Sequence, residues 1–142
     1  MTPYETFEHT ADIGLRMRGR NLTELFTNAG RGFFDLITDF DKIEKSDLPR
    51  IPVRIVLEAK DSGGLLLAWL RELLFIFSSK RLVLTEFDFK KINETGLEAL
   101  AYGILFDPSC HDQKYEVKAV TYHAFRLEKR EEDWLAEVIL DI

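Results

Sequence analysis

The 142-residue sequence contains a single cysteine, Cys110, and begins with no segment typical of a secretory signal. One thiol cannot form an intramolecular disulfide, and it is too few for a thiolate metal cage. The opening residues, MTPYE, lack the basic region and apolar stretch of a signal peptide. We therefore expect a cytoplasmic protein, since a reducing compartment suits a chain without disulfides.

Long apolar runs and familiar catalytic motifs are also missing. The most apolar stretch, residues 65–77, is interrupted by Arg71 and Glu72, and a spanning helix needs about 20 residues, so no membrane association is expected. There is no P-loop lysine motif, dinucleotide-binding glycine fingerprint, GxSxG elbow or HExxH motif. Cys110 precedes His111, but adjacent residues in a loop rarely face each other productively, which argues against a thiol nucleophile.

Basic residues are outnumbered, with 19 Lys and Arg against 25 Asp and Glu, for a formal net charge of −6. Proteins that bind phosphate backbones unaided use clustered Lys and Arg, so no strong direct nucleic-acid binding is expected. Hydrophobic residues at 46% and charged residues at 31% argue against disorder. The length predicts one domain, residues 1–142, with a buried core.

The hydrophobic pattern predicts strands and two helices. Asn21 is the expected cap of the first helix and Asp61 or Ser62 that of the second, and Trp69 and Trp134 are the expected core anchors. Strands are expected at residues 13–17, 53–59, 82–89, 97–106, 117–127 and 134–142, and helices at 22–37 and 62–77. This order predicts an α+β fold, a two-layer α/β sandwich with two helices packed on one face of a mostly antiparallel sheet.

Two acidic residues occupy strand positions that the hydrophobic pattern does not explain. Asp12 stands at the start of the first predicted strand, although Asp is disfavoured in strands, and Asp141 lies near the end of the last one, directly before Ile142. The simpler interpretations are a turn in which Thr10 and Asp12 bond to the backbone and a solvated chain end. If Asp12 lies beside Asp141 in the sheet, their carboxylates and the Ile142 terminal carboxylate converge. Such oxygen ligands suit Mg²⁺, Mn²⁺ or Ca²⁺. The sequence alone does not establish this adjacency.

Three further polar residues are candidate supporting groups. His9 lies three positions before Asp12, and Lys118 and His123 lie on the strand predicted at 117–127. Alternation in that strand places Lys118 and Tyr122 on one side and His123 on the other. The simpler interpretation is a solvated sheet face; the functional one makes Lys118 or His123 a contact for an anionic group or a partner of a metal ligand.

In these same segments the sequence resembles the archease family. The resemblance is carried, in order along the chain, by FEHTADIG (7–14), LFTNA (25–29), LLAWLRELLF (66–75), FDP (106–108), VKAVTYH (117–123) and WLAEVILDI (134–142). It implies a two-layer α/β sandwich. It also implies a divalent cation, calcium in structures of the family, at Asp12, Asp141 and the C-terminal Ile142.

The resemblance further implies an accessory protein rather than an enzyme. Archeases activate the RtcB-type tRNA-splicing RNA ligase, promoting its GTP-dependent guanylylation and multiple turnover, which implies docking near the partner's GTP-bound site. One alternative is a chaperone-like protein that modulates the solubility or specificity of an RNA-processing enzyme such as a tRNA methyltransferase. A metal-dependent phosphate-ester hydrolase is a third hypothesis, weakened by the absence of an evident nucleophile or base.

Overall fold

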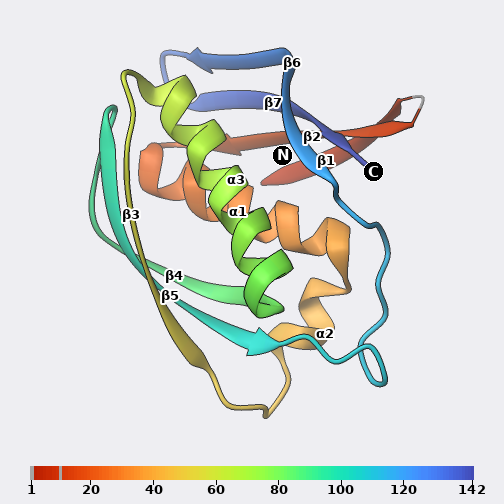
Figure 1. Ribbon diagram of the computed structural model, residues 1–142. Coiled ribbons are helices and arrows are strands. Elements are labelled where there is room, and N and C mark those ends of the chain that lie inside the picture. Colours follow the sequence, from red (N-terminus) through yellow and green to blue (C-terminus); the bar gives the residue numbers. More distant parts are fainter. Residues whose placement is uncertain (1, 10) are drawn as a thin grey trace.

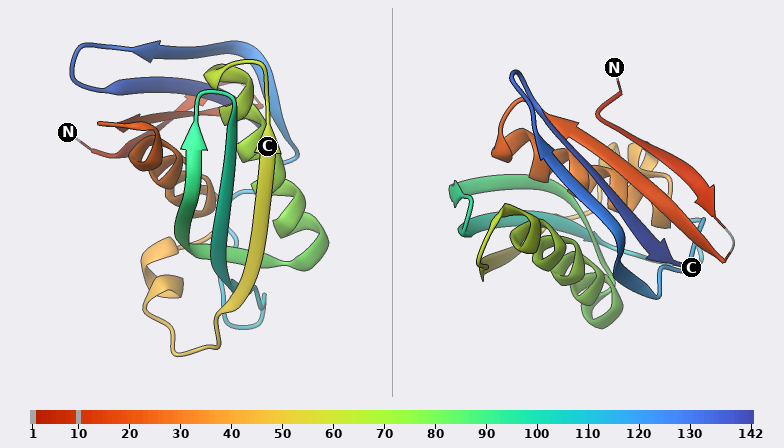
Figure 2. Two further views of the ribbon diagram at one scale, coloured as in Figure 1. Left: turned by 90° about the vertical axis from the view of Figure 1, so that its left-hand side faces the viewer. Right: turned by 90° about the horizontal axis from the view of Figure 1, so that it is seen from above.

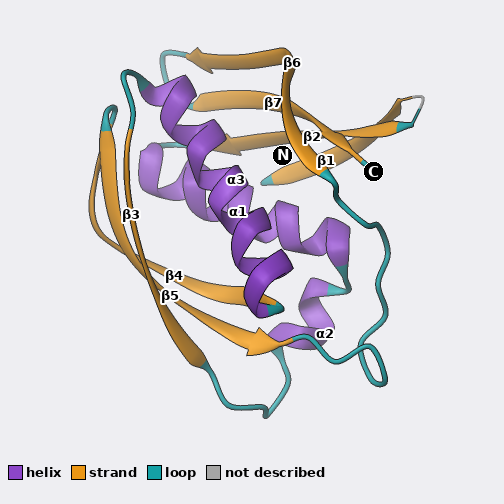
Figure 3. Cartoon of the chain, in the orientation of Figure 1, coloured by secondary structure: helices purple, strands orange, loops and turns teal. Residues whose placement is uncertain are grey.

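The computed structural model describes residues 2–9 and 11–142, folded into strands and helices that include the predicted ones in their predicted order (Figure 1). The strands are β1 (Tyr4–His9), β2 (Asp12–Gly19), β3 (Ile51–Glu58), β4 (Leu82–Asn93), β5 (Gly96–Leu105), β6 (Ala119–Lys129) and β7 (Trp134–Asp141). The helices are α1 (Leu22–Ile37), α2 (Phe40–Glu44) and α3 (Ser62–Lys80). Figure 3 colours the chain by these elements.

The strands form two antiparallel sheets with the orders β1-β2-β7-β6 and β3-β5-β4. The α+β class and the antiparallel pairing are therefore confirmed, whereas the single sheet divides into two. Helices α1 and α3 contact both sheets (Figures 1 and 2). The strands divide into two sheets because α3 is buried on more than one side. Its buried residues include the successive Leu65, Leu66 and Leu67. A helix that is apolar on more than one side needs cover on more than one side.

Both predicted helix caps are present. The Asn21 side chain accepts a hydrogen bond from the Glu24 amide at 2.8 Å, and the Asp61 side chain accepts one from the Gly64 amide at 2.7 Å. Glu24 in turn accepts from the backbone amide of Arg20, one residue before the cap. Each cap satisfies amide groups that the first helical turn leaves without intrahelical acceptors.

Trp69 of α3 occupies the centre of the core. Its ring is fully buried, it lies near Phe26 of α1 and Phe87 and Phe89 of β4, and its indole Nε1 donates to the Phe26 carbonyl at 3.0 Å. By length and composition α3 is a candidate membrane span, longer than residues 65–77 suggested. Its packing between the two sheets is that of a core helix.

Two elements and one irregularity were not predicted. β1 lacks a clear apolar alternation, because Phe7 faces outward over Gly14. Helix α2 has only five residues, too few for a periodic signal. In β6 the pairing with β7 shifts between Thr121 and Arg126, and Ala124 adopts a positive φ of 53°. This irregularity interrupts the expected alternation of the side chains of residues 118–123 between the two faces of the sheet.

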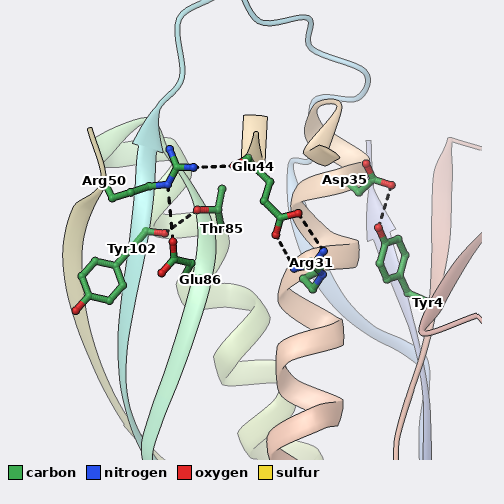
Figure 4. A network of polar contacts seen from close by, with 8 residues as sticks. All are labelled: Tyr4, Arg31, Asp35, Glu44, Arg50, Thr85, Glu86 and Tyr102. Carbon is green, nitrogen blue, oxygen red and sulfur yellow. Dashed lines mark hydrogen bonds and ion pairs between the residues drawn. The ribbon is translucent and has the colours of Figure 1, made fainter. Parts of the chain in front are cut away.

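A polar cluster fastens α1 to its surroundings (Figure 4). Arg31 of α1 pairs with Glu44 of α2 at 2.8 Å, and the Glu44 carbonyl accepts from Arg50 at 2.7 Å. Tyr4 of β1 donates to Asp35 of α1 at 3.2 Å. Burial first, and then the charge of Asp35, raise the pKa of Tyr4 to about 12. These contacts hold the N-terminal strand and α2 against the helix.

Candidate metal site

Asp12 and Asp141 are direct partners in the pairing of β2 with β7. Asp12 is the first residue of β2 and Asp141 the last of β7, so the two acids meet at one end of the four-stranded sheet. Figure 2 shows the end of β7 beside the β1–β2 hairpin. The condition that the sequence left open, adjacency of the two acids, is met.

Both acidic side chains belong to the outer face of this sheet. Their neighbours Ile13 and Leu140 also pair directly and are buried in the core, and successive residues of a strand point to opposite faces. Asp12 is half-buried, with its Oδ1 atom shielded from solvent, whereas Asp141 is exposed. The pair therefore combines one sheltered and one accessible carboxylate.

Strand β6 brings Lys118 to the same end of the sheet. Ala119 pairs with Asp141, and the Lys118 backbone amide donates to the Asp141 carbonyl at 2.8 Å. The Lys118 residue is exposed. Lys118, which has a cationic side chain, is therefore hydrogen-bonded through its backbone to Asp141.

His123 and His9 stand differently toward the site. His123 is exposed and lies within the irregular part of β6, where no partner on β7 is assigned. Tyr122 beside it is 73% exposed although Val120 is buried, because the shift in pairing breaks their common face. The backbone of His9 pairs with Asp12, but its side chain, like all of Thr10, lies outside what the structure describes.

Ile142 follows Asp141 and packs, partly buried, against the hydrophobic core. A packed side chain restrains the backbone immediately after β7, and with it the position of Asp141. The role of an Ile142 carboxylate as a ligand stays a prediction.

Arg16, which follows Asp12 on the same face of β2, forms ion pairs with other acids. Arg16 pairs with Glu5 of β1 and with Glu137 of β7, whose Oε2 lies 2.7 Å from its Nε. Arg126 of β6 continues the row to Glu137 at 2.8 Å. The bond to Glu5, and then that to Glu137, raise the pKa of Arg16 above its ordinary value. Arg16 is thus bonded to two acids of its own row and is set apart from the Asp12–Asp141 pair.

The chemistry of this pair favours a hard cation. Like charges directly opposite in an antiparallel pair are destabilising, and carboxylate oxygens are the ligands preferred by Ca²⁺, Mg²⁺ and Mn²⁺. Among the side chains that the structure describes, no cluster of three or more His, Cys, Asp or Glu residues could hold a metal ion. A cation at Asp12 and Asp141 would therefore need further oxygens from a carboxylate at Ile142, the backbone, water or a partner molecule.

The Cys110–His111 pair has no feature of an activated nucleophile. The His111 Nδ1 atom accepts a hydrogen bond from the Asp107 amide at 2.9 Å. Desolvation, followed by the charge of Asp107, raises the pKa of the Cys110 thiol, which keeps it protonated. The local turn, in which Asp107 also accepts from Ser109, accounts for this segment.

Sequence reasoning missed one contact near the site. Arg71 of α3 donates through both Nε and Nη2 to the Val120 carbonyl, each at 3.3 Å. The only signal in the sequence was a charged residue within the otherwise apolar stretch of residues 65–77. That signal does not identify a partner in another strand.

Comparisons with known proteins agree with this architecture. The model of the Archease protein family matches residues 4–142. The chain is 40% identical to protein archease of Pyrococcus abyssi and 35% identical to that of Sulfurisphaera tokodaii, in each case over the full length of both chains.

Two solved structures are also similar. A solution structure of protein 1598 from Methanobacterium thermoautotrophicum covers all of both chains with a TM-score of 0.76 and 33% identity. A crystal structure from Thermotoga maritima, described as an archease and possible chaperone, has a TM-score of 0.66 at 18% identity. It covers 97% of this chain and 96% of that one, and shares the fold. The chain belongs to the archease family.

Proposed function

We propose that this protein activates an RtcB-type tRNA-splicing RNA ligase through a divalent cation held at Asp12 and Asp141. The observation that carries the proposal is the direct pairing of these two acids at the exposed end of the four-stranded sheet. Membership of the archease family supports the choice of partner, through the properties that the resemblance implies.

The residues at this end suit the delivery of a cation to another protein. Asp12 is half-buried near the start of its strand, which limits its motion, while Asp141 is exposed and accessible to a partner. When bound, the cation would supply positive charge that offsets charge developing on the phosphates of GTP in the ligase. Lys118, bonded through its backbone to Asp141, would add a second positive group toward the same phosphates.

The incomplete set of ligands supports an action on a partner rather than an independent reaction. Two carboxylates leave most positions of a six- to eight-coordinate Ca²⁺ open, and phosphate oxygens of a bound nucleotide are suitable occupants. The acidic composition, with a net charge of −6, fits a protein that acts on an RNA-handling enzyme while that enzyme holds the RNA.

The proposal is tested by multiple-turnover RNA joining with a purified RtcB-type ligase, GTP and Mn²⁺. The wild-type chain should raise the number of ligations per ligase molecule, and Asp141→Asn should not. Glu137→Gln is the matched control, since it removes a carboxylate from the same strand and the same face. Equal stimulation by wild type and Asp141→Asn would exclude a role of the acid pair.

A chaperone-like action on an RNA-processing enzyme is the second candidate. Two observations favour it: the Thermotoga maritima protein of the same fold is described as a possible chaperone, and large apolar side chains such as Phe75 and Tyr122 are exposed. It predicts that a tRNA methyltransferase remains soluble for longer in the presence of this chain, equally with Asp12→Asn and without added metal.

A further inference from the structure

The segment of β6 next to the candidate site is held by few strand contacts. Residues 119–121 pair with β7, and regular pairing resumes only at Arg126, beyond the irregular stretch that contains Ala124. Among the strands that the structure describes, β6 is also the last of its sheet, so none of them lies beside its other edge. Three paired residues at an edge are too few to form a stable ladder by themselves.

Arg71 supplies a contact on that open edge. Its Nε and Nη2 atoms both lie 3.3 Å from the Val120 carbonyl, at the middle residue of the three. The helix that carries it is anchored on either side of this position by the fully buried Leu70 and Leu73. The guanidinium group is therefore attached to a helix that is anchored in the core.

The same short segment is bonded to the candidate site on its inner edge. The Lys118 amide donates to the Asp141 carbonyl at 2.8 Å, and the Thr121 hydroxyl donates to the Ile139 carbonyl at 2.9 Å. Residues 118–121 are thus held between Arg71 on one side and the last residues of β7 on the other. A loosened segment would free Lys118 and would leave the strand end that carries Asp141 paired with β2 alone.

We propose that Arg71 is a positioning residue that orders residues 118–121 and, through them, the Asp141 end of the candidate site. The functional consequence rests on the proposed function, whereas the ordering itself does not. Two donors from one planar group to a single carbonyl restrain the distance and the orientation of that carbonyl, which the point charge of a lysine does not reproduce.

The experiment measures backbone amide hydrogen exchange of the full-length chain by NMR, together with Tb³⁺ affinity by luminescence. In Arg71→Gln, exchange at Lys118 should accelerate at least tenfold, while the amide of Leu84 in the core keeps its wild-type rate. The Tb³⁺ dissociation constant should rise at least threefold. Arg54→Gln is the control, because Arg54 is an exposed partner of Glu98 on the other sheet.

A purely structural contribution would accelerate exchange at Leu84 and Lys118 together and lower the urea midpoint, which would overturn the proposal. So would unchanged exchange at Lys118, or an unprotected Lys118 amide in the wild type. If Arg71→Gln does not fold, Arg71→Lys serves instead and should show the same local loss. Failure of the wild type to bind Tb³⁺ would contradict the proposed function while leaving the exchange result to decide the positioning role.

Discussion

Asp12 and Asp141 lie directly opposite each other, as the first residue of β2 and the last residue of β7. The pairing brings two acidic side chains together from nearly opposite ends of the chain. On the same sheet, Glu5 and Glu137 are paired with Arg16. A sheet that places carboxylates in this way is destabilised unless something offsets their repulsion.

The first prediction concerns how the acid pair changes the free energy of unfolding. In EDTA, Asp12→Asn or Asp141→Asn should leave the free energy of unfolding unchanged or raise it by up to about 1 kcal/mol, because the repulsion is removed. With CaCl₂ or MnCl₂, the wild type should gain about 2.7 kcal/mol at one hundred times its dissociation constant. The variants should lose this gain. Thermal unfolding with and without metal measures both effects.

The control for this prediction is Glu137→Gln. Glu137 contacts Arg16 and Arg126, so its neutralisation should cost about 0–1 kcal/mol and preserve the stabilisation by metal. A full response to metal in Asp12→Asn would show that the cation binds elsewhere.

A second prediction addresses the expected carboxylate of Ile142. Two glycines appended after Ile142 move the terminal charge away from Asp141 while leaving the packed Ile142 side chain in place. We expect weaker Ca²⁺ binding by isothermal titration, by about tenfold, and an unchanged melting temperature in EDTA. Unchanged affinity would remove Ile142 from the set of ligands.

The third prediction follows from Tyr4, whose pKa is raised to about 12 by burial and by Asp35. An unfolded tyrosine has a pKa of about 10, so between pH 10 and 12 the folded protein binds more protons than the unfolded chain. Stability should therefore fall with rising pH across this window, and Tyr4 should contribute no pH dependence below it. Urea unfolding at pH 8.5, 10 and 11 measures the slope.

Tyr4→Phe provides the comparison, since it keeps the ring and removes the ionisable group. The variant should show a shallower fall between pH 10 and 12 than the wild type. Identical slopes would mean that Tyr4 titrates in the folded protein as it does in the unfolded chain.

The fourth prediction contrasts two glycines of β2. A Cβ on Gly19 would overlap the backbone of Leu25 in the first turns of α1, whereas the atoms nearest to a Cβ on Gly14 belong to the ring of Phe7. A backbone yields less than a side chain that can rotate away. Gly19→Ala should thus cost about 1–3 kcal/mol as an overpacked contact, and Gly14→Ala distinctly less.

Chemical denaturation of both variants checks this order. In a Phe7→Ala background, Gly14→Ala should become stabilising, because alanine is preferred to glycine within a strand when the space is open. A cost for Gly14→Ala that equals that of Gly19→Ala would contradict the packing described for Phe7.

Local patterns were sufficient to predict the helix caps at Asn21 and Asp61 and the buried Trp69. Each depends on residues near in sequence or on hydrophobic periodicity. The division into two sheets was not predicted, because it depends on which strands cover each side of α3 rather than on the strands themselves.

The candidate site could likewise be predicted only in part. Asp12 and Asp141 stood out as acids in strands, but their adjacency is a matter of register between β2 and β7, which no local pattern encodes. Arg71 and Val120 likewise meet across two elements. Tyr122 is exposed although Val120 is buried, because a shift in pairing interrupts the alternation of β6. Such shifts have little signature in a single sequence.

The most direct test of the account is the initial rate of ligase guanylylation, measured with GTP, Mn²⁺ and an RtcB-type ligase in the presence of each variant of this chain. The wild type and Glu137→Gln should accelerate formation of the ligase–GMP adduct, and Asp12→Asn and Asp141→Asn should reduce that acceleration at least tenfold while remaining folded. Acceleration by both aspartate variants at the wild-type rate would contradict the claim that the paired acids of β2 and β7 are the functional site.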